Sequence, residues 1–137
     1  MSAPSYAVYS LLNDAEYFSG WSVFIGRMPE ADATVKHNCV ALFDFIGRDL
    51  SRCYNKALPA IEQPSVQIKV RSTSYATGEE KIRAISRFLD QHDKWTVGDV
   101  IYHSVFQKGS YFPLTLDEQG RTLWVANFRV VLEDHSA

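Results

Sequence analysis

A serine, a histidine and an aspartate close together in a chain could support nucleophilic catalysis, and this sequence contains one such group. His103 is followed directly by Ser104, and Asp99 lies four residues before the histidine. The segment has the composition of a β-strand, in which neighbouring residues point to opposite faces of the sheet. His103 and Ser104 would therefore not easily share a proton, and we expect no catalytic site here.

The two cysteines, Cys39 and Cys53, are the other reactive side chains. His37 lies two residues before Cys39, but a structural zinc site needs four ligands and no second pair lies near Cys53. Two cysteines are also too few for a disulfide framework, so we expect free thiols packed as small hydrophobic groups. Motifs of named enzyme families are missing from the sequence as well. The sequence therefore predicts no catalytic residue, no metal site and no cofactor.

The composition limits the classes of protein to which this chain can belong. The chain has 137 residues, of which 46% are hydrophobic, enough for one domain over 1–137 with a substantial core. Its longest apolar runs are a few residues, far below the roughly 20 of a membrane-spanning helix. The net charge is -2, and lysine and arginine are scattered singly. A tight nucleic-acid binder usually has a basic stripe, so we expect no specific binding to DNA or RNA and no membrane contact.

In the first half of the chain, the hydrophobic spacing predicts a helix over residues 4–14, beginning at a proline suited to a first turn. Strands are predicted over 21–25 and 38–45, where β-branched and aromatic residues are frequent. The polar segment 47–63 is predicted to be a long loop, with a short helix around 50–58 as the alternative.

The second half begins with the clearest local pattern. Residues 65–71 alternate strictly between apolar and polar side chains, as in a half-buried strand. A helix follows over 75–91, capped by Thr73 or Ser74, with Glu79 and Arg83 spaced to pair along it.

The remaining segments are predicted to form a turn and three further strands. The turn is expected at 95–98 and the strands at 100–107, 111–116 and 122–132, with a reversal at 117–120. The last strand places alternate apolar residues from Trp124 to Leu132 on one face. This order predicts an α+β fold, in which two helices cover one face of a mixed, mostly antiparallel sheet.

Several of these segments, taken in order, resemble one family. They are residues 64–71 (PSVQIKVR) with Tyr75 close behind, the second helix, residues 116–121 (LDEQGR), and the strand around 126–128 (ANF). This succession resembles the tail terminator proteins of long-tailed bacteriophages. The resemblance covers residues 64–134, whereas the first half is similar only in outline, through its helix, its strands and residues 26–29 (GRMP).

The resemblance implies a non-enzymatic structural protein of the virion, made in the host cytoplasm and placed at the tail-neck junction. It implies a homo-hexameric ring that caps the tail tube, ends tube polymerisation and meets the head-side connector, while DNA passes through the lumen without specific binding. Arg71 and Arg121 are expected at strand ends, where a guanidinium could reach a carboxylate of a neighbouring subunit. On this basis, the expected interface with subunits or partners comprises Arg71, Tyr75, Asp117, Arg121 and Asn127.

Two other classes of function remain open from the sequence. One is a small cytoplasmic enzyme or ligand-binding domain, with a pocket between the second helix and the sheet. The other is a different phage neck protein, such as a head completion protein.

Overall fold

A computed structural model describes residues 3–51, 60–116 and 120–135 of the chain. Its elements in chain order are α1 (Pro4–Asp14), β1 (Ser22–Ile25), β2 (Cys39–Ser51), β3 (Ala60–Ser72), α2 (Tyr75–Leu89), β4 (Trp95–Val97), β5 (Val100–Gln107), β6 (Phe112–Leu116) and β7 (Thr122–Asp134).

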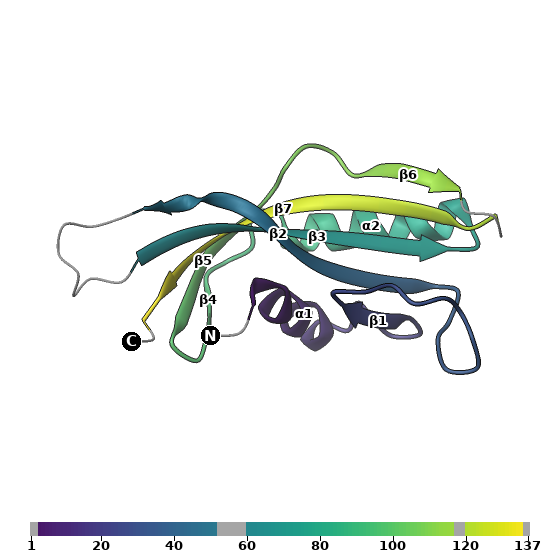
Figure 1. The fold of residues 1–137 in the computed structure, drawn as a ribbon, viewed down its shortest axis with the longest axis horizontal. Helices are drawn as coiled ribbons and strands as arrows, with labels where there is room; N and C mark the ends of the chain where they lie inside the picture. Colours follow the sequence, from purple (N-terminus) through teal and green to yellow (C-terminus); the bar gives the residue numbers. More distant parts are fainter. Residues whose placement is uncertain (1–2, 52–59, 117–119, 136–137) are drawn as a thin grey trace.

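The strands of the described residues form one curled sheet in the order β1-β2-β3-β7-β5-β4 (Figure 1). β3 and β7 form its centre and are antiparallel along their whole length. The other edge of β7 is shared, because β5 pairs with its second half and β6 with its first. Among the paired strands of the described residues, only β1 and β2 run parallel. The prediction of a mixed, mostly antiparallel sheet is confirmed.

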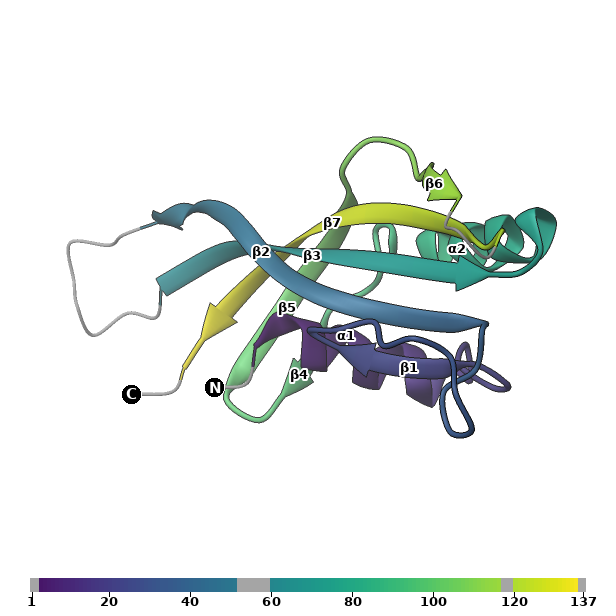
Figure 2. The ribbon, with the colours of Figure 1, turned by 45° about the vertical axis from the view of Figure 1, so that its right-hand side comes forward.

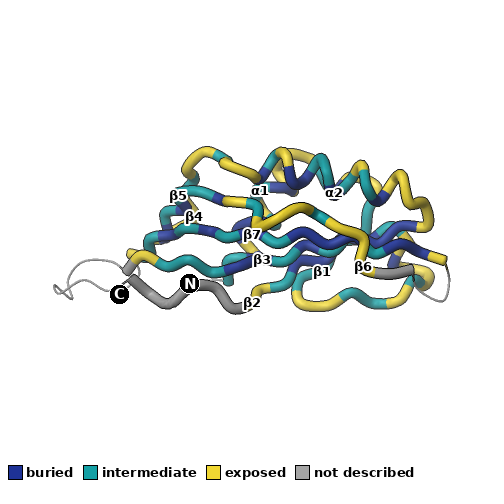
Figure 3. The backbone as a smooth tube through the Cα atoms, turned by 90° about the horizontal axis from the view of Figure 1, so that it is seen from above, coloured by how far each residue is buried: buried dark blue, intermediate teal, exposed yellow. Residues whose placement is uncertain are grey.

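Both helices lie on the same side of the sheet, as Figure 3 shows. One hydrophobic core fills the space between the helices and the sheet. The central strands contribute alternate residues to this core, among them the predicted set of the last strand, in which Phe128 and Leu132 are fully buried. The α+β arrangement expected from the sequence is therefore confirmed.

The two helices begin and end for identifiable local reasons. Pro4 occupies the first turn of α1, where its missing N–H costs no hydrogen bond. At α2 the hydroxyl of Ser74 accepts a hydrogen bond from the Thr77 N–H, which satisfies one free donor of the first turn. Arg83 and Glu79 are 3.3 Å apart across one turn, as predicted. Neither described helix has the length and apolarity required to span a bilayer.

The predicted loop over 47–63 is wrong in its described part. β2 continues to Ser51 and β3 begins at Ala60, so these strands extend the antiparallel pair beyond Phe45. The register shifts twice, between Phe45 and Arg48 and between Arg48 and Ser51. Such irregularities break the alternation that identifies a strand in a sequence. The alternative of a helix at 50–58 is also wrong at 50 and 51, and residues 52–59 lie outside the described part.

The turn predicted at 95–98 is wrong as well, because Trp95–Val97 is a short edge strand, β4, paired with β5. Trp95 stacks on Tyr102 of that strand with ring centroids 4.8 Å apart. The reversal occurs directly after β4, at Gly98, whose φ of 57° suits glycine.

Gly78 allows the closest approach of α2 to the sheet. A Cβ atom at this position would lie 2.9 Å from Cδ1 of Trp124 and 3.3 Å from Cβ of Ser72. Gly78→Ala is expected to lower the free energy of unfolding by about 1 kcal/mol, because overpacking costs roughly 1–3 kcal/mol and the gain in helix propensity offsets about 1 kcal/mol of it. Urea unfolding measures the change. The exposed neighbour substitution Thr77→Ala is the control, and equal stability of both variants would contradict this packing.

Candidate assembly surface

The face of the sheet opposite the helices is partly accessible: Phe43, Gln67, Lys69 and Asn127 are half-buried there, and Ser65 is buried. Because side chains alternate along a strand, the residues between the buried ones point to this face. Cross-strand pairs join Phe45 to Ser65, Ser65 to Arg129 and Arg129 to Phe106 in one row. We call this surface the open sheet face and define it by its residues: Phe43, Phe45, Ser65, Gln67, Lys69, Phe106, Lys108, Phe112, Asn127 and Arg129.

Aromatic side chains on the open sheet face are unusually accessible. Phe45, Phe106 and Phe112 are 46%, 43% and 40% exposed. Isolated exposed apolar residues are common on protein surfaces, but a group of them on one sheet face is typical of a surface that binds another protein.

Polar contacts hold the open sheet face in a defined geometry. Gln67 Nε2 donates to Oδ1 of Asn127 over 3.0 Å, across β3 and β7. Lys108 Nζ donates to the Ser65 hydroxyl over 3.3 Å and lies 5.9 Å from the ring centroid of Phe45. Of the residues predicted at an interface, Asn127 is therefore at the centre of this face, in a pair that fixes its side chain.

Arg71 occupies one end of the same face, where the loop 26–38 folds over the sheet. Its side chain is only 4% exposed. The guanidinium donates to three backbone carbonyls of the loop, those of Pro29 (2.8 Å), Lys36 (3.0 Å) and His37 (3.0 Å). The expected exposure of Arg71 at a strand end is thus wrong, because its donors are used within its own chain. Its role at a subunit interface stays a prediction.

The loop held by Arg71 has an internal turn of its own. Oδ1 of Asp32 accepts hydrogen bonds from the N–H groups of Thr34 (2.7 Å) and Val35 (2.9 Å). These two backbone donors lower the pKa of Asp32. The loop is therefore shaped both by its own hydrogen bonds and by the arginine beneath it.

Arg121 is also buried, with 3% of its side chain exposed. Its Nη2 lies 2.8 Å from Oε2 of Glu30, whose side chain is 72% exposed. Arg121 therefore ties the loop 26–38 to the start of β7. As with Arg71, the predicted exposure is wrong, and a contact with another subunit stays a prediction.

Tyr75 and Asp117 complete the predicted set. Tyr75, at the start of α2, is 59% exposed and packs edge-on against Trp124 with centroids 4.9 Å apart. Its exposed side chain lies on the helix side of the sheet, and its role at an interface stays a prediction. Asp117 lies outside the described residues. The structure thus places Arg71 on β3 and Asn127 on β7, with Arg121 directly before β7 and Tyr75 at the start of α2.

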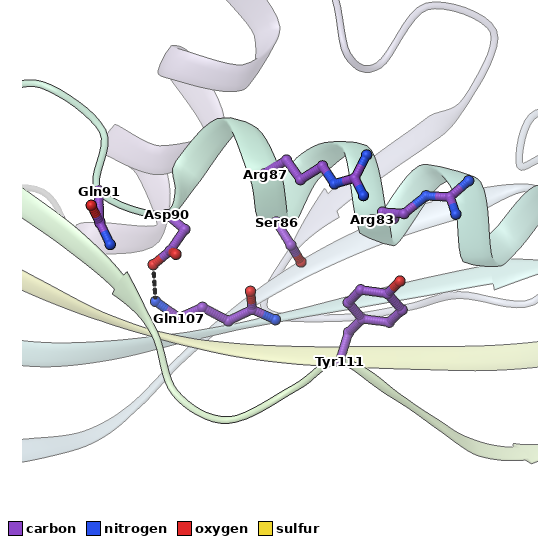
Figure 4. A pocket seen from close by; sticks show the side chains of 7 residues that line it. All are labelled: Arg83, Ser86, Arg87, Asp90, Gln91, Gln107 and Tyr111. Carbon is purple, nitrogen blue, oxygen red and sulfur yellow. Dashed lines mark hydrogen bonds between the residues drawn. The ribbon is translucent and has the colours of Figure 1, made fainter.

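A polar cleft lies between α2 and the segment that joins β5 to β6. Its volume is about 470 Å³, and Figure 4 shows its seven lining residues: Arg83, Ser86, Arg87, Asp90, Gln91, Gln107 and Tyr111. Ser86 is 2% exposed, and its hydroxyl has no hydrogen-bond partner among the described residues. Tyr111 donates to Glu79, which raises the pKa of the tyrosine. This is where the ligand-binding alternative places its pocket, and the described residues that line it include no histidine or cysteine.

His103, the histidine of the group Asp99, His103 and Ser104, pairs with a carboxylate of the last strand. Within the described residues, the polar partner of His103 is Glu133, at 3.5 Å, rather than Ser104 or Asp99. Glu133 also bonds to His135, and the bonds from His135 and His103 lower the pKa of the Glu133 carboxyl.

Cys39 is a buried free thiol, as predicted, whereas Cys53 lies outside the described residues. No cluster of side chains suited to a metal ion occurs in the described ranges.

Comparison with known proteins identifies the family. The family model described as bacteriophage tail terminator protein matches residues 8–134. The chain belongs to the bacteriophage tail terminator family. It is therefore a structural protein of the phage tail and neck region, and its location is the virion. The match extends well beyond residues 64–134, on which the resemblance rested, into the first half of the chain.

A solved structure supports the fold. A chain of the virion of a native gene transfer agent particle superposes with a TM-score of 0.61 at 18% sequence identity, over 92% of this chain and 91% of that one. A search of curated proteins finds no match.

The sequence did not predict the open sheet face as a surface, although Asn127, which lies on it, was among the expected interface residues. The missed residues alternate with core residues in the predicted strands, so their side of the sheet was available from the pattern. Their accessibility depends on both helices packing on the other side, which the pattern of each strand does not reveal.

Proposed function

We propose that six copies of this single tail-terminator-like domain form a ring on the end of the tail tube. The ring stops tube polymerisation and provides the interface to the head-side connector. The observation that carries this proposal is the family match over residues 8–134. The open sheet face supports it, because a structural protein that assembles into a ring needs an accessible apolar surface.

Termination follows from the symmetry of a tube. A tube grows because each added ring presents the same surface as the last, and contacts of this head-to-tail kind do not close by themselves. A ring that matches the tube on one side and differs on the other occupies the growing end and offers no site for the next ring. The different side is then available to the connector. A net charge of -2 suits a lumen through which DNA passes without specific binding.

Tail length in phages that lack this protein tests the proposal. Without the cap, tubes should grow beyond their normal length, and heads should fail to join them, as measured by electron microscopy. Purified protein added to growing tubes should bind one end and block elongation. Negative-stain images of the purified protein, alone and on tubes, should show six-fold rings.

Tails of normal length that still join heads in the deletion strain would contradict termination. If such tails instead lost only their heads, a connector role would replace the capping role. A catalytic or ligand-binding role in the cleft at α2 would be indicated if charge removal there, as in Arg87→Ala, abolished infectivity while rings and tail length stayed normal.

A further inference from the structure

We propose that the open sheet face is the surface on which a second copy of this chain docks, and that the second copy contributes an acidic end of the molecule. This inference rests on the proposed ring and assigns the two surfaces that meet within it. The acidic end is defined by four residues: Asp44, Glu62, Asp99 and Asp134.

The open sheet face is positively charged at its centre. Lys69, Lys108 and Arg129 project from neighbouring strands or from the segment that follows β5. The carboxylate on the same side of β7, Glu133, lies at the far end, next to His103 and His135. Since the chain as a whole carries -2, these cations are outweighed by carboxylates elsewhere on its surface.

The acidic end is assembled from elements that are distant in sequence. Val100 and Ala60 both pair with Asp134, and Glu62 pairs with Leu132 two residues before it. The carbonyl of Asp99 accepts a hydrogen bond of 2.8 Å from His135 N–H. In Figures 1 and 2, the end of β7, the turn between β4 and β5 and the start of α1 lie together at one end of the molecule.

Two further observations describe the charge and shape of this end. Burial first, and then the negative charges of Asp134, Asp44 and Glu62, raise the pKa of Tyr102. Exposed apolar groups accompany the carboxylates, because Tyr6 and Val97 are 52% and 43% exposed. Tyr6 follows Ser5, whose N–H and hydroxyl donate to the carboxylate of Asp44.

The two surfaces are therefore complementary in charge, and both present exposed apolar side chains. Phenylalanine rings beside cations on one copy can meet apolar side chains beside carboxylates on the next. The apolar contact supplies buried area, and the opposite charges fix register and exclude other pairings. Because the surfaces differ and lie at different places on the molecule, the contact is head-to-tail, which is the kind that generates rings.

Charge reversal on each surface, followed by mixing, tests the assignment. One variant carries Lys69→Glu and Lys108→Glu, and the other carries Glu62→Lys and Asp99→Lys. Each alone should self-associate about tenfold more weakly or worse, because like charges then face each other. Mixed in equal amounts, the two should form rings again, since every contact in an alternating ring of six pairs opposite charges. Mass photometry and negative-stain images, with and without tail tubes, give the readout.

The control variants are Lys94→Glu and Glu80→Lys, which change exposed charges outside both surfaces. Circular dichroism melting must show that all variants fold. If the wild type forms rings and each reversed variant does so equally well, or if mixing fails to restore assembly, the docking assignment is wrong while the ring proposal stands. A wild type that never oligomerises, even on tubes, overturns both. If reversal on the open sheet face abolishes binding to duplex DNA and leaves rings intact, that face meets DNA and the assignment is also wrong.

Discussion

Arg71→Ala is expected to lower the free energy of unfolding by about 3–5 kcal/mol, or roughly 10–20 °C in melting temperature. The guanidinium is buried and donates to the carbonyls of Pro29, Lys36 and His37. A hydrogen bond to a charged group contributes roughly 1.5–3 kcal/mol, and water that enters after truncation recovers part of the loss. Thermal and urea unfolding measure the effect.

Two matched variants separate the loss of the buried hydrogen bonds from the loss of an arginine side chain as such. Arg129→Ala removes an arginine from the same side of the sheet that makes no hydrogen bond within the described residues, and it should change stability by only about 0.5 kcal/mol. Arg71→Lys keeps the positive charge but presents one compact ammonium group, so it should recover only part of the stability. Equal melting temperatures for Arg71→Ala and the wild type would show that the loop 26–38 is held by other contacts.

The same arginine shows what a strand pattern can predict. The alternation over residues 65–71 correctly assigned Val66, Ile68 and Val70 to the core and Arg71 to the other side. It did not predict that Arg71 is buried, because the covering loop 26–38 lies far away in sequence. Burial on the second side of a sheet depends on such long-range contacts, and hydrophobic periodicity contains no information about them.

Elements were predicted correctly where local signals agreed. The second helix, predicted over 75–91 and observed over Tyr75–Leu89, has a cap at Ser74 and a buried stripe at helical spacing, both of which are visible in the sequence. By contrast, β4 is three residues long and is defined by its pairing with β5, while the outer part of β2 and β3 contains register shifts. These strands form because a partner strand lies beside them, so single-sequence patterns identify them poorly. The family resemblance succeeded because it used the order of several weak signals.

Trp124→Ala is expected to lower the free energy of unfolding by about 3–5 kcal/mol, the usual range for removing a buried aromatic ring. Trp124, on β7, is 4% exposed and packs against both α2 and the segment before β6. Its ring lies 4.9 Å from that of Tyr75 on α2 and 5.9 Å from that of Tyr111 before β6, measured between centroids. Gly78 packs directly on it. Unfolding in urea gives the magnitude.

Trp124→Phe is the matched variant and should cost much less than the alanine substitution. It keeps an aromatic ring and removes the indole N–H, which is buried without a hydrogen-bond partner in the described part of the chain. The smaller ring should also leave room for a methyl group at Gly78, so Gly78→Ala should be less harmful with Phe than with Trp at position 124. Additive effects of the two substitutions would contradict direct packing. Tyr75 packs on the indole of Trp124, so the two variants also test the role of Tyr75 in assembly. If Trp124→Ala weakens hexamer assembly and Trp124→Phe does not, the accessible Tyr75 takes part in the assembly contacts. The packing beneath α2 would then be needed for termination.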